Sequence, residues 1–327
     1  MMTCRREMVF NVRGRIFPGF LVPLLLCAAG VAFNLSFAHG TVAGGEAAEI
    51  RRDTVNPGRD VGEVRTTVND NKCLPVRNIP EDELAFREGE RLEFSVRYKW
   101  GIIDSEVGVA SATVAGTRGS DGSPLFHCVA QGRTSRFFDV FFKVRERFES
   151  WFRTDNMRPV SALRDTYEGG YEARNKYVWL RPGERIDADV YTTRLGDTSL
   201  VLSGTQCTFD LVSLFYFARN LDFDNYRMNV KYPISFAIDD DIYNLYFIIL
   251  GREAVKIKGV GTFNTIKFAA RMVAGEVFNG ETDMFIWVTD DKNRVPVYFE
   301  SPIKVGAVSG RITGFSGLKH PLSSKID

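Results

Sequence analysis

The chain has 327 residues and a formal net charge of +1, because 42 Lys and Arg residues are balanced by 41 Asp and Glu residues. This balance gives no broad field of one sign, so it favours neither nucleic acid nor an acidic membrane surface as a partner. Hydrophobic residues make up 44% of the chain and phenylalanine alone contributes 26 residues, which is enough for a large packed core.

Residues 1–38 have the layout of a secretory signal peptide. Four arginines in the first 15 residues precede an apolar run over residues 16–35, and Ser36-Phe37-Ala38 gives the small-x-small pattern of a cleavage site. We predict export to the periplasm with cleavage after Ala38, which leaves about 290 residues, enough for one large β domain.

Two alternatives to cleavage remain open. An apolar run of about 20 residues can span a bilayer, so the segment can also stay as a membrane anchor. The chain can also be a lipoprotein linked through Cys27, although the preceding Leu26 is larger than the small residue that such a site prefers.

Residues 39–82 have no sustained apolar period and are rich in Gly, Asn, Asp and Thr. Such a segment buries too little surface to offset the entropy lost on ordering, so we predict a flexible leader. We expect a single β-barrel-like domain over residues 83–320 and a tail over residues 321–327.

The first strand of that domain is predicted over residues 91–100, where apolar and polar residues alternate strictly. Alternation with a period of two indicates a strand with one buried and one solvated face. The apolar positions are Leu92, Phe94, Val96, Tyr98 and Trp100. Together with Phe148 and Phe152 of a later run, the inward aromatic residues Phe94, Tyr98 and Trp100 are our candidate lining of a ligand cavity.

Many further short runs rich in β-formers follow, separated by Gly, Asp, Asn and Pro. They lie at residues 106–115, 125–131, 144–152, 177–180, 186–192, 243–250, 254–257, 264–270, 284–289 and 295–300. Short strands with regular turns predict an all-β fold, a sandwich or a barrel.

One short helix is expected near residues 208–221. Asp210 is a suitable N-cap, and Leu211, Leu214, Phe215 and Ala218 follow helical spacing after it. Apolar residues also occupy the opposite face, so we expect the helix to be buried against the sheet or to plug its open end.

Near the C-terminus, the segment 284–312 predicts an antiparallel hairpin. Two β-rich runs flank the polar turn 290–294, and Pro296 lies just inside the returning strand. Together with residues 86–100, 136–148 and 210–219, this segment resembles the bacterial family known as domain of unknown function 3108. The turn matches the family's signature at Trp287, Asp290, Asp291, Asn293, Arg294 and Pro296.

The resemblance covers nearly the whole chain after Phe86 and implies an exported β-rich fold without assigning an activity. A sheet with one apolar face must cover it, and few helices are available here. We therefore predict a large antiparallel curled sheet, a barrel or half-barrel, closed by the helix. An outer-membrane barrel is the rival architecture, but the chain lacks a terminal aromatic strand.

Candidate catalytic groups are scarce. His127 and Cys128 are adjacent on a predicted strand and therefore point to opposite faces, so they cannot form a dyad. Cys73, Cys128 and Cys207 remain after signal cleavage, and an oxidising compartment permits one disulfide, for which we select Cys128 with Cys207. The alternative is that both are small buried hydrophobic residues.

The acidic runs 239–241 and 290–291 lack the spacing of a calcium loop, and no zinc pattern is present. We expect Arg294 to pair with Asp290 or Asp291 and Asn293 to adopt left-handed angles, which makes this turn structural. We predict no metal, no cofactor and no enzymatic activity.

The leading hypothesis is a periplasmic protein that binds or carries an apolar, lipid-like ligand inside the curled sheet. The alternatives are an envelope assembly factor that binds a protein through its sheet edges and, ranked last, a carboxylate-based hydrolase.

Overall fold

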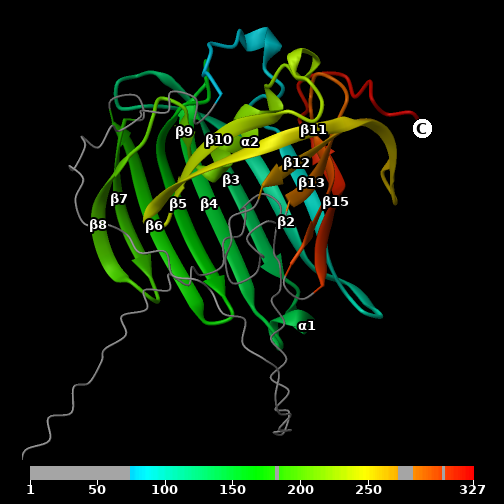
Figure 1. Cartoon of the computed structure of the whole chain (residues 1–327), viewed down its shortest axis with the longest axis horizontal. Helices are drawn as coiled ribbons and strands as arrows, with labels where there is room; N and C mark the ends of the chain where they lie inside the picture. The colour runs from blue at the N-terminus through cyan, green and yellow to red at the C-terminus, as the bar shows by residue number, and fades with distance from the viewer. Residues whose placement is uncertain (1–73, 181–183, 272–282, 304–305) are drawn as a thin grey trace, which may run out of the picture.

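The computed structural model describes residues 74–180, 184–271, 283–303 and 306–327 (Figure 1). The predicted signal peptide and most of the leader lie outside the described residues. The strands are β1 (Arg91–Trp100), β2 (Ile103–Arg118), β3 (Pro124–Thr134), β4 (Val144–Arg153), β5 (Pro159–Glu168), β6 (Tyr171–Leu180), β7 (Arg185–Thr192), β8 (Gly196–Ser203), β9 (Thr208–Phe209), β10 (Lys231–Ile238), β11 (Asp241–Ile257), β12 (Gly261–Arg271), β13 (Asp283–Thr289), β14 (Pro296–Pro302) and β15 (Ala307–Ser316). The helices are α1 (Arg136–Asp139) and α2 (Leu211–Arg219), with 3-10 turns η1 (Glu81–Glu83) and η2 (Phe223–Asn225).

All fifteen strands belong to one sheet with the order β8-β7-β6-β5-β4-β3-β2-β1-β15-β14-β13-β12-β11-β10-β9. Neighbouring strands are antiparallel except β9 and β10, which are parallel. The predicted antiparallel all-β fold is therefore confirmed, as is the one substantial helix near residues 208–221. The sheet is open, however, because in the described part of the chain no backbone ladder joins β8 to β9. We predicted a curled sheet, a barrel or half-barrel; the closed barrel is thus wrong, and the structure shows one large, mostly antiparallel open sheet.

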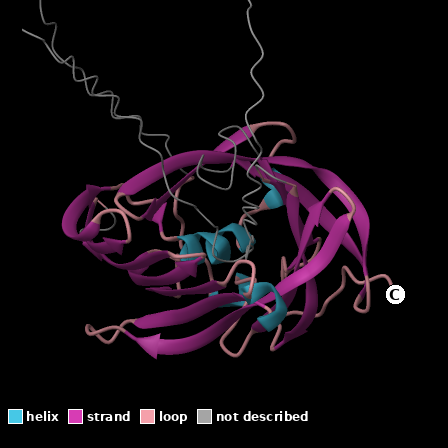
Figure 2. Cartoon of the chain, turned by 90° about the horizontal axis from the view of Figure 1, so that it is seen from below, coloured by secondary structure: helices cyan, strands magenta, loops and turns pink. Residues whose placement is uncertain are grey.

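Helix α2 covers the apolar face of the sheet and contacts β3, β4 and β10 (Figure 2). Side chains, not a backbone ladder, connect the two ends of the sheet. Trp179 on β6 donates its indole N–H to the carbonyl of Thr208 on β9 at 2.9 Å, and a small apolar cluster joins Leu202 of β8 to Ala237 of β10. These side-chain contacts bury the apolar face of the sheet near its two ends, although no backbone hydrogen bonds join the end strands.

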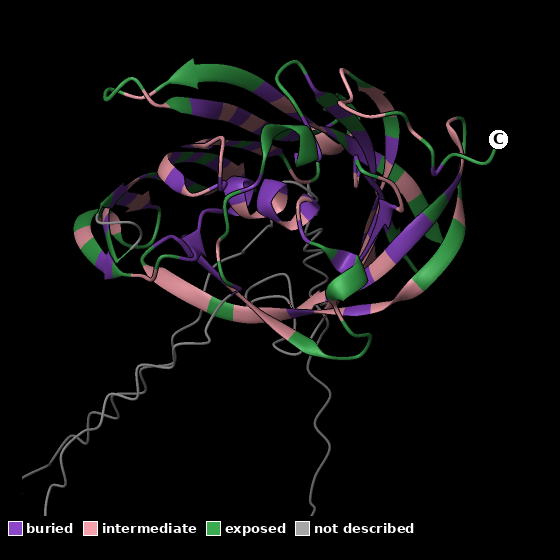
Figure 3. Cartoon of the chain, turned by 90° about the horizontal axis from the view of Figure 1, so that it is seen from above, coloured by how far each residue is buried: buried purple, intermediate pink, exposed green. Residues whose placement is uncertain are grey.

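The largest core lies between α2 and the facing strands, where Figure 3 shows buried residues concentrated around the helix. Leu92, Phe94 and Val96 of β1 are buried as predicted from the alternation. Trp100 is 44% exposed, so its predicted burial is wrong. The reason is its position at the last residue of β1, beyond the edge of the packed layer.

The predicted boundaries of the domain need correction at both ends. Leu74 and Ile79, in the segment assigned to the leader, are buried in the core, and the amide of Leu74 donates to the carbonyl of Pro233 at 3.2 Å. In the predicted tail, Ser324 is buried and Lys325 forms a β-bridge with Phe263. Within the described residues, no helix combines the length and apolar character needed to cross a bilayer.

Candidate ligand cavity beside helix α2

Helix α2 begins at Asp210, as predicted, because the carboxylate of this residue satisfies the free amides of the first turn. Its Oδ1 accepts from the amides of Val212 at 2.8 Å and Ser213 at 3.0 Å, and the Ser213 hydroxyl accepts in return from the Asp210 amide at 3.1 Å. Ser150 on β4 donates to Asp210 Oδ2 at 2.6 Å, which ties the helix to the sheet. This capping box therefore sets the position of the helix.

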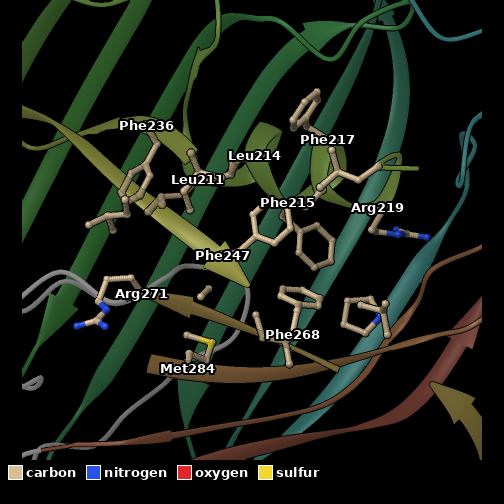
Figure 4. Close-up of a pocket in the computed structure, with 18 of the residues that line it drawn as sticks. Leu211, Leu214, Phe215, Phe217, Arg219, Phe236, Phe247, Phe268, Arg271 and Met284 are labelled. Carbon is tan, nitrogen blue, oxygen red and sulfur yellow. The ribbon is translucent and has the colours of Figure 1, made fainter. Parts of the chain in front are cut away.

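A cavity of about 130 Å³ lies between α2 and strands β10–β14 (Figure 4). Its wall includes Leu211, Leu214, Phe215 and Ala218, which form the apolar stripe predicted on the helix. Aromatic residues of the strands, including Phe236, Phe247 and Phe268, complete the wall. The lining is apolar apart from two arginines, so the cavity offers an environment for hydrocarbon.

The two charged residues of the lining lie on opposite sides of the view in Figure 4. Arg219 is held in a buried ion pair with Glu90. Arg271 pairs with Asp283 at 2.8 Å and donates to the Tyr246 hydroxyl at 2.5 Å, and its side chain is 23% exposed. Arg271 is therefore a charged residue that lines the cavity and is also partly exposed to solvent.

The volume limits what can enter. An engineered apolar cavity of about 150 Å³ stays dry and binds benzene, whereas sites for whole drug-sized ligands measure about 300–1,000 Å³. A space of 130 Å³ accommodates one ring or a few methylene groups. A complete acyl chain would need the surrounding strands or α2 to move apart.

The aromatic residues that we selected from the sequence are outside this wall. Phe94, Tyr98, Phe148 and Phe152 are buried in packed core, and none of them lines the cavity. Their proposed ligand contact stays a prediction. The cavity is made instead by strands far away in sequence, which the alternation of a single strand does not reveal.

The cysteines do not form the predicted pair. Cys128 is free and buried, whereas Cys207 is disulfide-bonded. The pairing of Cys128 with Cys207 is therefore wrong. Cys128 lies on an inward position of β3, where burial raises the pKa of its thiol. It behaves as a small core residue, the alternative that the sequence left open.

The turn of the family signature joins β13 to β14 as predicted, but its internal bonds differ. The residue with left-handed angles is Arg294, at φ +48°, and its Nε donates to the carbonyl of Asp291 at 3.0 Å. Asp290 pairs with Arg252 at 2.9 Å. Asn293 is fully buried, and its Nδ2 donates to the carbonyl of His320 at 3.0 Å.

His127 is half-buried and has a structural environment. Its Nε2 lies 2.8 Å from Glu149, and its ring stacks on Trp151 with centroids 4.3 Å apart. Neither neighbour carries a hydroxyl or thiol that the imidazole could activate as a nucleophile. In the described ranges, no group of three or more His, Cys, Asp or Glu residues is arranged to hold a metal ion.

Sequence reasoning missed a buried ionic cluster on the inner face of β4–β6. Arg164 binds Asp239 at 2.5 Å, and Thr166 donates to Glu146 at 2.8 Å. Burial and the neighbouring Glu168 raise the pKa of Glu146, while Arg164 opposes that rise. The alternation in residues 144–152 could have indicated that Glu146 is buried, because it places Glu146 on the same face of the strand as Phe148.

Comparisons with known proteins agree with the sequence resemblance. Residues 93–313 match the model of a family described as protein of unknown function, DUF3108. No protein with a curated description matches the chain.

Two solved structures show a distant likeness. A beta-barrel-like protein of domain of unknown function DUF1849 from Brucella abortus is 10% identical with a TM-score of 0.46, and the match covers 75% of this chain and 100% of that one. A protein with a YmcC-like fold from Bacteroides fragilis is 8% identical with a TM-score of 0.28, covering 74% and 100%.

Proposed function

The chain belongs to the DUF3108 family of proteins of unknown function, and from its cavity we propose that it is an exported, non-enzymatic protein that binds an apolar, lipid-like ligand. The observation that carries this proposal is the apolar cavity beside α2. The signal-peptide pattern of residues 1–38 supports export to the cell envelope.

The chemistry of the cavity favours a hydrocarbon group over a polar substrate. Burying a polar group without a partner is costly, and the strands around the cavity present Leu, Ile and Phe side chains. Transfer of each methylene group from water into such a space is favourable by about 0.8 kcal/mol. A ligand that inserts a few methylene groups therefore gains a few kcal/mol from this site.

Arg271 supports a more specific form of the ligand. It lies at one side of the cavity, where it donates a hydrogen bond to the Tyr246 hydroxyl and forms an ion pair with the Asp283 carboxylate. A ligand carboxylate or phosphate could replace Asp283 as the partner of this guanidinium, because both anions match its planar donor geometry. We propose an acyl chain with an acidic head group, whose distal end enters the cavity while the strands move apart to admit the rest.

The test uses cis-parinaric acid, a fluorescent fatty acid, titrated into the mature protein. Ala218 lies on the wall, and Ala218→Phe places a ring in the cavity. We expect at least about tenfold weaker binding, since the loss of two methylene contacts already corresponds to that factor. The matched control is Val201→Phe, at a position 55% exposed on β8, which should bind like the unmodified chain.

The outcome that counts against the proposal is equally specific. If the unmodified protein gives no fluorescence change, and mass spectrometry of organic extracts of the purified protein finds no amphiphile, the cavity is only a packing defect. Unchanged binding by Ala218→Phe would place the fatty acid elsewhere.

A second candidate function rests on the open sheet. Strand β8 ends the sheet order, and its residues 197–199 are exposed. An edge strand of this kind can pair with an extended segment of another envelope protein. Val201→Pro removes one amide donor from this edge, so it should abolish a crosslinked partner complex under this function and leave fatty-acid binding intact.

A further inference from the structure

Antiparallel order brings alternate connections of the sheet to the same rim. The rim that contains the end of β12 and the start of β13 also contains the β14–β15, β1–β2, β3–β4, β5–β6 and β7–β8 connections. We call it the lower rim, because these connections and α1 lie at the bottom of Figure 1. Arg271, which lines the cavity, is the last residue of β12 and pairs with Asp283 at the start of β13.

Large exposed apolar side chains gather at the lower rim. Of the fourteen such residues in the described ranges, five lie in its connections and two more, Trp100 and Ile103, are the strand residues that flank the β1–β2 turn. The exposed fraction is 103% for Ile102, 82% for Val140 and 69% for Phe137. The others are Trp100, Ile103, Phe141 and Leu195. Single apolar residues scattered over a surface need no explanation, but exposed apolar side chains repeated at the loop tips of one rim indicate a binding surface.

The β3–β4 loop is built to hold its apolar tip outward. The Thr134 hydroxyl donates to Asp139 at 2.5 Å, and Arg145 binds both oxygens of the same carboxylate, at 2.9 and 2.5 Å. Hydrogen bonds from Arg145 and Thr134 lower the pKa of Asp139 to about 2, so these bonds persist at neutral pH.

A second contact seats this loop on the neighbouring turn. The amide of Gly169 donates to the carbonyl of Lys143 at 2.9 Å, and a Cβ atom at Gly169 would lie 2.2 Å from the Phe142 ring. Phe138 also packs against the core. Because Phe138 and Phe142 anchor the loop, Phe137 and Phe141 stay exposed instead of collapsing inward.

Basic residues flank the apolar tips. Lys99 precedes the β1–β2 turn, and Arg136 and Lys143 enclose the tip of the β3–β4 loop. The acidic residues nearest to these tips, Asp104 and Asp139, each pair with an arginine. Basic side chains therefore flank the exposed apolar side chains at both tips.

We propose that the lower rim docks on an anionic phospholipid bilayer, with the tips of the β1–β2 and β3–β4 connections inserted among the head groups. Aromatic side chains favour the bilayer interface, and each basic residue near an anionic surface strengthens binding about fivefold. The tips protrude, which suits a deformable bilayer. This docking does not require that the cavity be filled.

Sedimentation with vesicles tests the proposal on the mature chain. We expect the protein to sediment with vesicles of equal parts dioleoylphosphatidylglycerol and dioleoylphosphatidylcholine, and to sediment weakly with vesicles of the latter alone. The double variant Phe137→Ser with Phe141→Ser should lower the partition coefficient about tenfold or more, because two apolar anchors are lost. The control is Met228→Ser, at a position 61% exposed off this rim.

Charge and folding controls complete the experiment. Lys99→Glu with Arg136→Glu should remove the preference for anionic vesicles, and added salt should weaken it. If circular dichroism shows that the double Phe variant does not fold, Ile102→Ser tests the other tip.

The proposal is overturned if the protein does not bind anionic vesicles, or if these substitutions leave vesicle binding unchanged. A dimer in light scattering that the Phe substitutions dissolve also overturns it, since the tips would then bind a second copy. Failure here leaves the fatty-acid titration unaffected, so the two proposals are tested separately.

Discussion

Arg219, on the last turn of α2, and Glu90, just before β1, form a bidentate ion pair with distances of 2.5 and 2.9 Å. The two side chains are 2% and 0% exposed. Arg219 also donates from its Nε and a terminal nitrogen to the carbonyl of Asn293. One guanidinium thus connects the helix, the first strand and the turn of the family signature, which gives that turn a structural role.

We predict that Glu90→Gln lowers the free energy of unfolding by about 3–5 kcal/mol, because it leaves the buried Arg219 charge without a counterion. Urea denaturation measures the change. The control is Glu93→Gln, which breaks the ion pair of Glu93 with Arg91, whose side chains are 49% and 51% exposed, and should cost less than about 1 kcal/mol. Equal losses in both variants would show that the Arg219 pair adds little to stability.

The two adjacent aspartates of the signature turn are expected to differ in importance. Asp291 Oδ1 accepts from the Asn293 amide at 3.0 Å, and its Oδ2 accepts from the Ser324 hydroxyl at 2.7 Å. Asp291→Asn replaces an acceptor by a donor and should lower the unfolding free energy by about 1–3 kcal/mol. Asp290→Asn breaks a partly exposed pair and should cost less than about 1 kcal/mol.

Thermal melting of the two variants decides this point, and a screen of glycoside and ester substrates accompanies it. A hydrolase that uses this pair would lose activity in Asp290→Asn without any loss of melting temperature. Neither variant is expected to change any activity, because we assign the turn a structural role.

Stability should fall as the pH rises above about 4.5, the ordinary pKa of a glutamate. Burial and the Glu168 carboxylate raise the pKa of Glu146 well above that value in the folded chain, and burial raises the pKa of Glu168. Over the window between the unfolded and folded pKa values, the folded state holds a proton that the unfolded state has released. Each such proton contributes a loss of up to about 1.4 kcal/mol per pH unit.

Urea denaturation at several pH values above 4.5 measures this slope. Glu146→Gln should flatten it, since the amide cannot ionise, whereas Glu172→Gln at an exposed position of β6 should leave it unchanged. A slope that Glu146→Gln does not alter would assign the pH dependence to other buried acids, of which Asp210 has a pKa raised by burial.

Local sequence patterns predicted the elements whose residues follow one simple rule. Strand β1 alternates cleanly, and α2 has both a suitable N-cap at Asp210 and an apolar stripe, so both were found. Strand β5 was missed because its inward positions include Arg164, Thr166 and Glu168, and polar residues there hide the alternation. Their burial depends on partners in distant segments, such as Asp239, which no local pattern contains.

The candidate cavity was predictable only in its helical half. Leu211 and Leu214 were expected on one face of the helix, but the strands that oppose them are β10–β14 and not β1. Strand order, which decides this, depends on the whole sheet. The exposure of the apolar loop tips was not predicted from the sequence, for a different reason. Ile102 and Phe137 are apolar, and apolar residues in a β-rich sequence are first assigned to the core.

The last prediction concerns the ion pair that holds two distant parts of the open sheet together. Asp239 joins β10 to β11, and its carboxylate binds Arg164 of β5 and accepts from Asn175 of β6 at 2.7 Å. Ile234, Phe236 and Ile238 of β10 line the cavity, so this pair restrains one wall of it. Asp239 has a φ of +48°, an angle that Asn tolerates, so Asp239→Asn changes the charge without straining the backbone.

We expect Asp239→Asn to raise deuterium uptake in β10 and β11 while β1 keeps its protection, because local opening follows the loss of contacts at that place. Asp240→Asn, at the exposed neighbouring position, is the control. A cavity of 130 Å³ must widen to admit an acyl chain. Because β10 opens more often in Asp239→Asn, this variant should also bind cis-parinaric acid with a higher association rate. If deuterium uptake rose equally in β1, the substitution would have destabilised the whole fold. The Arg164–Asp239 ion pair would then have no special role in restraining the cavity wall.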